Sequence, residues 1–339
     1  MKGLFLAATA LTFATAAGIA TAVHAADVPP PWAYGFAGPP PNPMPPPAPP
    51  AAPPQLDTTV QHTLPGSTAT FTRAQIANRY GPADWYPEDH PAMPDIVAKG
   101  RESATPQIFA CGLCHYPNGK GRPENANVTG LTYDYIVQQL TDFKNGARKT
   151  SDPRKGNTAL MAGFARSMTD DEIKAAAKYF SAIPATPWIK VVESETVPKT
   201  RPAGGILLPI EGAEAGMEPI GARIVESPVN VEDTELRRNP RSGFIAYVPP
   251  GSVKKGEALV TTGGGKTTAC TACHGTDLKG LGPVPTIAGR SPSYVTRQLY
   301  DMQHGNRAGI WTPLMAPVVS KLTEDDMLNA AAYLASLQP

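Results

Sequence analysis

The chain has 339 residues, enough for two domains, and 41% of them are hydrophobic. Its formal net charge is only +1, with 30 basic and 29 acidic residues and no basic tract. This balance excludes an electrostatically driven nucleic-acid-binding protein, so we expect no nucleic-acid partner.

The first 25 residues have the pattern of a secretory signal peptide. Lys2 precedes an apolar run that ends near Ala22, and Val23-His24-Ala25 supplies a small-residue cleavage site. The run is rich in Ala and Thr rather than Leu, which argues against a permanent transmembrane helix. We therefore expect export to the periplasm, with membrane association only through a partner or an uncleaved leader.

Residues 26–57 form a proline-rich spacer, because 14 prolines fall between positions 29 and 54. Such a composition favours polyproline-type or disordered chain, and both alternatives are retained. An extended spacer would act as a tether that lets the rest of the protein swing between partners. Trp32, Tyr34 and Phe36 are aromatic side chains that could dock on another surface.

All four cysteines lie in two C-x-x-C-H motifs, Cys111-Gly112-Leu113-Cys114-His115 and Cys270-Thr271-Ala272-Cys273-His274. This motif is the signature of covalent c-type haem attachment. Two thiols reach two vinyl groups of one porphyrin, and the following His ligates the iron. A disulfide in each motif would leave both histidines unexplained, and a four-Cys zinc site would have to join separate parts of the chain. The motifs therefore predict two covalently bound haem c groups, held by Cys111, Cys114, Cys270 and Cys273, with His115 and His274 as axial ligands.

The two motifs head a tandem repeat. From Cys111 to Arg148 the chain matches itself at an offset of 159 residues, and beyond that point at 154, so the first repeat has five extra residues within 149–157. This defines a first domain at 58–187, a second at 241–339, and a connector at 188–240. The connector has 6 basic and 9 acidic residues and two apolar runs, so we expect it to be ordered across the domain surfaces.

Each repeat ends in a predicted amphipathic helix that begins with a capping sequence. Thr169-Asp170-Asp171-Glu172 is a capping box, and Thr323-Glu324-Asp325-Asp326 is a looser relative. Apolar residues follow both sequences at helical spacing. The stretches around Tyr135 and Tyr294 are also predicted to be helical.

The second axial ligands are predicted to be Met161 and Met315, which match across the repeat on a polar loop before the last helix. A thioether ligand favours Fe(II) and raises the potential. His304 is the rival in the second domain, but its repeat partner is Asn145. Arg148 and Arg307 are candidate partners for the haem propionates, with a solvated surface role as the alternative.

These motifs together resemble the cytochrome c4-type dihaem cytochromes of the class I cytochrome c superfamily. The resemblance rests on the C-x-x-C-H pairs, on the segments 142–148 and 285–290, and on the two Leu-Met-Ala sequences. It implies an all-α fold of two tandem class I cytochrome c domains joined by an irregular connector. It also implies His/Met-ligated irons that exchange electrons with respiratory complexes such as a terminal oxidase or a quinol–cytochrome c reductase. The second repeat has Pro283 and Pro285 after its haem motif, whereas the first has Glu124 and Ala126.

The leading functional hypothesis is a non-enzymatic periplasmic electron carrier. A cytochrome subunit of a periplasmic dehydrogenase complex uses the same haem chemistry and remains an alternative. A dihaem peroxidase is a third hypothesis. It would need one iron with an open sixth site and acid–base residues above it. The matched methionines argue against the peroxidase.

Overall fold

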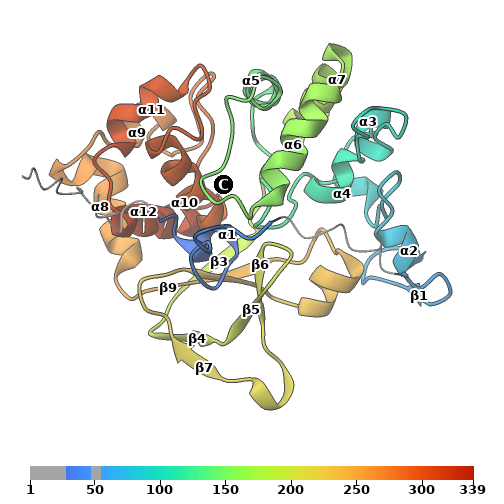
Figure 1. Ribbon diagram of the computed structural model, residues 1–339, viewed down its shortest axis with the longest axis horizontal. Helices are drawn as coiled ribbons and strands as arrows, with labels where there is room; N and C mark the ends of the chain where they lie inside the picture. Colours follow the sequence, from blue (N-terminus) through green and yellow to red (C-terminus); the bar gives the residue numbers. More distant parts are fainter. Residues whose placement is uncertain (1–27, 47–54) are drawn as a thin grey trace, which may run out of the picture.

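The structure, a computed structural model, describes residues 28–46 and 55–339. The two helical domains lie beside each other, and the connector forms a third body that faces both of them (Figure 1). The predicted signal peptide lies outside the described residues. Within the described ranges, no helix is both long and apolar enough to cross a bilayer.

The first domain is helical. Its helices are α3 (Asp95–Ala98), α4 (Cys111–His115), α5 (Tyr133–Lys144), α6 (Gly156–Ser167) and α7 (Asp170–Ser181). The predicted capping box at the start of α7 is confirmed, since Thr169 and Glu172 exchange hydrogen bonds with each other's backbone. Apolar side chains of α3, α5 and α7 form one buried core.

The second domain repeats this plan. It contains α8 (Ser252–Thr262), the short η5 (Gly263–Gly265), α9 (Thr271–His274), α10 (Pro292–Gln303), α11 (Thr312–Val319) and α12 (Glu324–Ser336). Thr323 caps α12 through Asp326, as predicted. Helix α8 crosses α12 at Gly256, where a Cβ atom would lie 1.9 Å from the Asn329 carbonyl oxygen. Only glycine permits this close approach.

The connector is not irregular, which corrects the all-α expectation. Its strands are β3 (Ile189–Glu193), β4 (Thr196–Pro198), β5 (Thr200–Ala203), β6 (Ile206–Pro209), β7 (Met217–Pro219) and β8 (Val225–Pro228). Strand β9 (Phe244–Val248) of the second domain joins β3 in parallel and β8 in antiparallel register. The 3-10 turn η3 (Gly212–Glu214) and the π-turn η4 (Asp233–Arg237) complete the segment. The strands are three to five residues long, and their apolar residues fill two small cores.

An N-terminal extension packs on the first domain ahead of its helices. It contains β1 (Gln61–His62), β2 (Phe71–Thr72), α2 (Arg73–Ile76) and η2 (Pro87–Asp89) around a cluster of Leu64, Ile76, Trp85 and Tyr86. Trp85 Nε1 donates to the Arg237 carbonyl oxygen at 2.8 Å, and Arg73 Nη1 donates to the Leu236 carbonyl oxygen at 2.7 Å. The extension therefore holds η4 in place.

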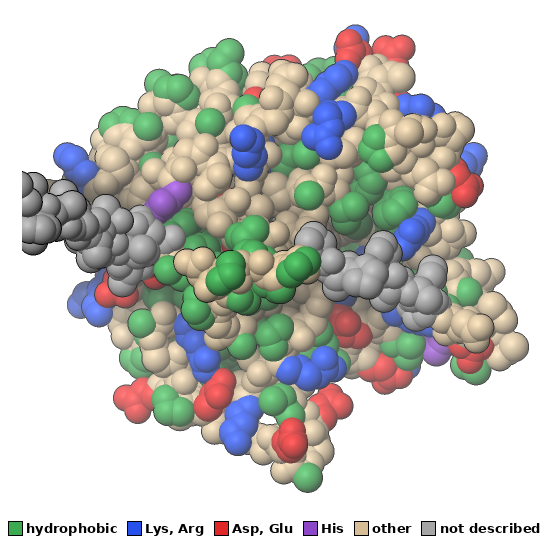
Figure 2. All heavy atoms as spheres, in the orientation of Figure 1, with side chains coloured by type: hydrophobic (Ala, Val, Ile, Leu, Met, Phe, Trp, Pro, Cys, Tyr) green, Lys and Arg blue, Asp and Glu red, His purple; other side chains and the backbone are tan. Residues whose placement is uncertain are grey.

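Part of the proline-rich segment is packed, not free. Helix α1 (Pro31–Tyr34) lies between the second domain and the connector, and Ala33 and Tyr34 are fully buried in the core of the second domain. The Tyr34 hydroxyl donates to Asp301 Oδ1 at 2.8 Å, and Arg297 Nη1 donates to the Ala33 carbonyl oxygen. Residues 28–46 cross the middle of the face in Figure 2. For these residues the tether and disordered-tail readings are wrong, because the aromatic side chains dock within the same chain.

Candidate haem sites

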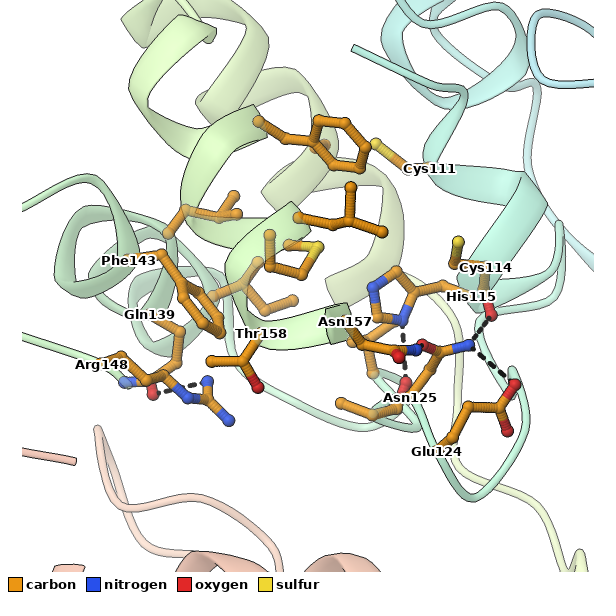
Figure 3. A pocket seen from close by; sticks show the side chains of 18 of the residues that line it. Cys111, Cys114, His115, Glu124, Asn125, Gln139, Phe143, Arg148, Asn157 and Thr158 are labelled. Carbon is orange, nitrogen blue, oxygen red and sulfur yellow. Dashed lines mark hydrogen bonds between the residues drawn. The ribbon is translucent and has the colours of Figure 1, made fainter. Parts of the chain in front are cut away.

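The first site is a pocket between α4, α5 and α6. Helix α4 brings Cys111, Cys114 and His115 to one side, and Arg148 and Gln139 lie at the other (Figure 3). Both cysteines are unpaired thiols, as are Cys270 and Cys273 in the second site. The disulfide alternative is therefore absent from this structure.

Both motif histidines are oriented by a backbone carbonyl. His115 Nδ1 lies 2.8 Å from the Ala126 oxygen, and His274 Nδ1 lies 2.8 Å from the Pro285 oxygen. Positions 126 and 285 are equivalent in the repeat, so the hydrogen bond does not need the proline of the second repeat. With Nδ1 engaged in this way, Nε2 is the nitrogen available to a metal. Burial lowers the pKa of both histidines, which favours the neutral, ligating form.

The candidate methionines lie in the same pockets as the histidines. Met161 lines the first cavity and Met315 the second. Both belong to helices, α6 and α11, so the prediction of a loop at these positions is wrong. His304 does not line the second cavity; its ring stacks on Tyr300 with centroids 3.9 Å apart.

The walls of both pockets suit a porphyrin. The first cavity has a volume of about 180 Å³ and the second about 360 Å³. The apolar lining of the first comes from Phe109, Leu131, Ile136, Phe143, Phe164 and Phe180. That of the second comes from Leu259, Ile287, Val295, Leu299, Trp311 and Val318. An apolar slot with two thiols, an imidazole and a thioether is the donor set of a covalently bound haem.

A mirrored hydrogen-bond network joins the two sites. Arg148 Nη2 donates to the Tyr294 hydroxyl (3.2 Å) and to Gln298 (2.9 Å), while Arg307 Nη2 donates to the Tyr135 hydroxyl (2.7 Å) and to Gln139 (3.0 Å). The backbones of the two arginines form an antiparallel bridge. Each repeat thus donates its arginine to the tyrosine and glutamine of the other.

The guanidinium groups of this network are not in direct contact with protein carboxylates. Neither Arg148 nor Arg307 forms an ion pair with any acidic side chain in the described ranges. Burial opposes ionisation of Tyr294, yet the two guanidinium charges lower the pKa of Tyr294 to about 8. Arg148 lines the first cavity and Arg307 the second. The site is therefore suited to a ligand that brings carboxylates, as haem does with its propionates.

The sequence analysis missed a second cation at the first site. Lys155 is 7% exposed, lines the first cavity, and its Nζ has no hydrogen-bond partner in the described part of the chain. Burial, together with the Arg297 charge, lowers the pKa of Lys155 to about 7. Arg297 reaches the same cavity from α10 of the second domain. The five extra residues of the first repeat, which lie within 149–157, were the available signal for Lys155.

The fold and the two sites define a dihaem c-type cytochrome with tandem domains. Comparison with known families agrees: the cytochrome c family matches residues 97–183 and 253–338, just over half of the chain. The chain belongs to the cytochrome c family, and its two cytochrome c domains bind two haem c groups.

Several known proteins are similar to this chain. The thiosulfate dehydrogenase electron acceptor of Thiomonas intermedia (strain K12) is 26% identical over 237 residues, which cover 69% of this chain and 81% of that protein. Cytochrome c4 of Azotobacter vinelandii is 36% identical over 76 residues, or 22% of this chain and 34% of the relative. The crystal structure of reduced recombinant cytochrome c4 from Pseudomonas stutzeri has a TM-score of 0.44 and 22% identity, and covers 67% of this chain and 93% of its own. The chain is thus an electron-transfer cytochrome.

Proposed function

We propose that the protein carries electrons one at a time between a periplasmic dehydrogenase and a respiratory acceptor, through two His/Met-ligated haems. Bound haem supplies the one-electron couple between ferric and ferrous iron. The mirrored arginine network is the observation that carries the proposal. Tyr135, Gln139, Tyr294 and Gln298 line both cavities, so the two sites share one wall.

In this proposal the residues of each site have fixed roles. Cys111 and Cys114 hold the first haem covalently, and His115 and Met161 ligate its iron. Cys270, Cys273, His274 and Met315 do the same at the second site. The Ala126 and Pro285 carbonyl oxygens hold the imidazole rings at the correct angle. Arg148 and Arg307 bind propionates, supported by their place on the cavity walls without carboxylate partners.

The proposed donor is a dehydrogenase of the thiosulfate-oxidising kind. The support is the similarity to the electron acceptors named for thiosulfate dehydrogenase in Thiomonas intermedia and in Stutzerimonas stutzeri (strain A1501), the latter 24% identical over 237 residues. Export to the periplasm is proposed from the leader sequence at residues 1–25. Docking of a donor or acceptor is expected to be weak and transient, with a small interface.

An electron carrier, rather than a peroxidase, is favoured by the methionine in each cavity. A thioether on both irons leaves no vacant coordination position for peroxide. The test is an optical redox titration of the haem-loaded protein with and without carbon monoxide. We expect two low-spin haems whose spectra do not change on addition of the gas. Carbon monoxide binding to either ferrous haem would contradict the ligand assignment at that site and restore the peroxidase hypothesis.

A further inference from the structure

The buried amine of Lys155 distinguishes the first haem cavity from the second. Its side chain lines the cavity, the residue is only 7% exposed, and Nζ has no hydrogen-bond partner in the described part of the chain. Lys155 lies in the segment 149–157, which holds the five extra residues of the first repeat. The charged residues that line the second cavity are Asp142, Arg290 and Arg307. The second cavity therefore has no equivalent amine.

The loop that carries Lys155 is packed against the N-terminal segment. The Lys155 backbone nitrogen donates to the Asp152 carbonyl oxygen at 3.1 Å, and the fully buried Asp152 carboxylate pairs with Arg154 at 2.7 Å. The Arg154 guanidinium lies 3.9 Å from the centre of the Phe36 ring and donates to the Gly38 carbonyl oxygen at 2.9 Å. These contacts fix the backbone from which the amine enters the cavity.

Charged groups from three parts of the chain act on the Lys155 amine. They come from its own loop, from the loop after the haem motif and from α10 of the second domain, and they are Asp152, Glu124, Arg297 and Asp301. The connector approaches with backbone only, since a Cβ atom at Gly205 would lie 3.9 Å from Nζ. Within residues 28–46 and 55–339, no acidic side chain forms an ion pair with Lys155.

The acidic groups near Lys155 are engaged by other partners. Asp301 Oδ1 accepts hydrogen bonds from the Tyr34 hydroxyl and the Ser151 backbone nitrogen, both at 2.8 Å. Glu124, on the wall of the cavity in Figure 3, accepts from Arg122 at 2.6 Å through Oε1. Its Oε2 atom is buried and has no hydrogen-bond partner among the described residues. The acidic groups thus attract a proton on Lys155 without forming a salt bridge with it.

Arg297 opposes protonation of Lys155. Its guanidinium lines the same cavity and donates to the backbone carbonyl oxygens of Ala33 and Pro123. Burial, together with the Arg297 charge, lowers the pKa of Lys155 to about 7. Bound haem adds propionates, which favour the protonated amine, and ferric iron, which disfavours it. Of these charges, only that of the iron changes when an electron arrives.

We propose that Lys155 is a redox-linked proton acceptor of the first haem site. The neutral amine takes one proton from solvent when one electron from the donor reaches the first haem, and it becomes an ammonium. The proton replaces the positive charge that the iron loses, and it returns to solvent when the electron moves on. The potential of the first haem should therefore fall as the pH rises. This inference rests on the proposed electron-carrier function.

Midpoint potentials of the haem-loaded, full-length protein test the proposal when they are measured from about pH 5 to about pH 10. The potential of the first haem should fall by up to about 59 mV per pH unit between two plateaus, because a tenfold change in a one-electron equilibrium corresponds to 59 mV. The potential of the second haem, identified by its shift in a Met315→Ala variant, should not show this slope.

Two substitutions separate the charge of Lys155 from its packing. Lys155→Met keeps the apolar stem and removes the amine, so the potential of the first haem should stay at the native high-pH plateau at every pH. Lys155→Arg keeps a permanent cation, so this potential should stay at the native low-pH plateau. Lys149→Met is the matched control at an exposed lysine that lines the same cavity. It should retain the native slope because solvent screens its charge.

Proton uptake gives a second measurement. Reduction of the native protein in weakly buffered solution with a pH indicator should take up to about one proton per chain, and Lys155→Met should lack this uptake. An equal slope in the native protein and in Lys155→Met would overturn the role of Lys155 while the carrier function stands. A slope shared by both haems would overturn it in favour of Tyr294, which lines both cavities. Haems that cannot be cycled at an electrode would contradict the carrier function itself.

Discussion

The two haem domains share the same helices around their haem sites, yet they differ in what surrounds them. In the first domain, the connector covers the cysteine edge, the N-terminal extension holds the connector turn η4, and Lys155 adds a buried cation to the cavity. In the second, the long helix α8 crosses α12 and the cysteine edge is open. The repeated sequence therefore builds two similar pockets. The segments outside the repeat give the pockets different access to solvent and different charge.

Removing the thiols of one domain should have the largest effect, because haem binding should be lost at that site and kept at the other. Cys270→Ser with Cys273→Ser should lower the haem content from two per chain to one, because the thioether bonds are lost and only the axial ligands remain. Cys111→Ser with Cys114→Ser should do the same at the first site. A haemochrome assay against protein concentration measures the ratio. Haem loss from both sites in either variant would show that the two domains do not assemble independently.

Replacing one methionine should change one potential. Met161→Ala should lower the potential of the first haem on the order of 100 mV, because a soft thioether that stabilises Fe(II) is lost. Met315→Ala should act only on the second. Each variant should also bind carbon monoxide at one iron. Met327→Ala, a buried methionine that lines neither cavity, is the matched control. Two unchanged midpoint potentials in a redox titration would refute the assignment.

The mirrored network predicts matching effects at the interface. Arg148→Leu and Arg307→Leu each remove three hydrogen bonds from a charged donor and should each lower the free energy of unfolding by about 2 kcal/mol. The double variant should lose less than the sum, since the two side chains share Gln139 and Gln298. Denaturant unfolding of the haem-loaded variants measures these energies. Fully additive losses would mean that the halves of the network are independent.

The smallest effect is expected at Tyr34. Burial, with the adjacent Asp301 carboxylate, raises the pKa of its hydroxyl well above the ordinary value of about 10. The folded state therefore holds the proton more tightly, and this stability is present below about pH 10 and is lost as the pH rises above it. Tyr34→Phe should lower the free energy of unfolding by about 1 kcal/mol at neutral pH. Above about pH 10 the stability of this variant should fall less steeply than that of the native protein. If the free energy of unfolding changed with pH in the same way in both proteins, Tyr34 would not contribute to the pH dependence of stability.

The local features of the fold could be predicted from the sequence, and its long-range contacts could not. The C-x-x-C-H motifs, the offset of 159 and the capping boxes at Thr169 and Thr323 are adjacent-residue patterns with a fixed physical meaning. The burial of Tyr34 depends on Asp301, 267 residues away, so proline content alone suggested a free spacer. The connector strands are too short to show alternation, and their partners come from distant sequence.

The candidate site shows the same division. Cys, His and Met positions followed from the repeat, although the helical setting of Met161 and Met315 did not, because the polar segments before the last helices suggested loops. The pairing of Arg148 with Tyr294 required the relative placement of two domains. No single repeat contains that information.

The docked N-terminal segment imposes an order on assembly. Residues 31–34 are synthesised long before α10, which supplies both Asp301 and Arg297 to hold them. The segment cannot reach its final position until nearly the whole chain is available, so the closing of this contact is a late step. Closing so long a loop costs entropy that grows only slowly with length, but it slows folding. Residues 31–34 are therefore among the last to reach their final position, and they do so only when the second domain has formed.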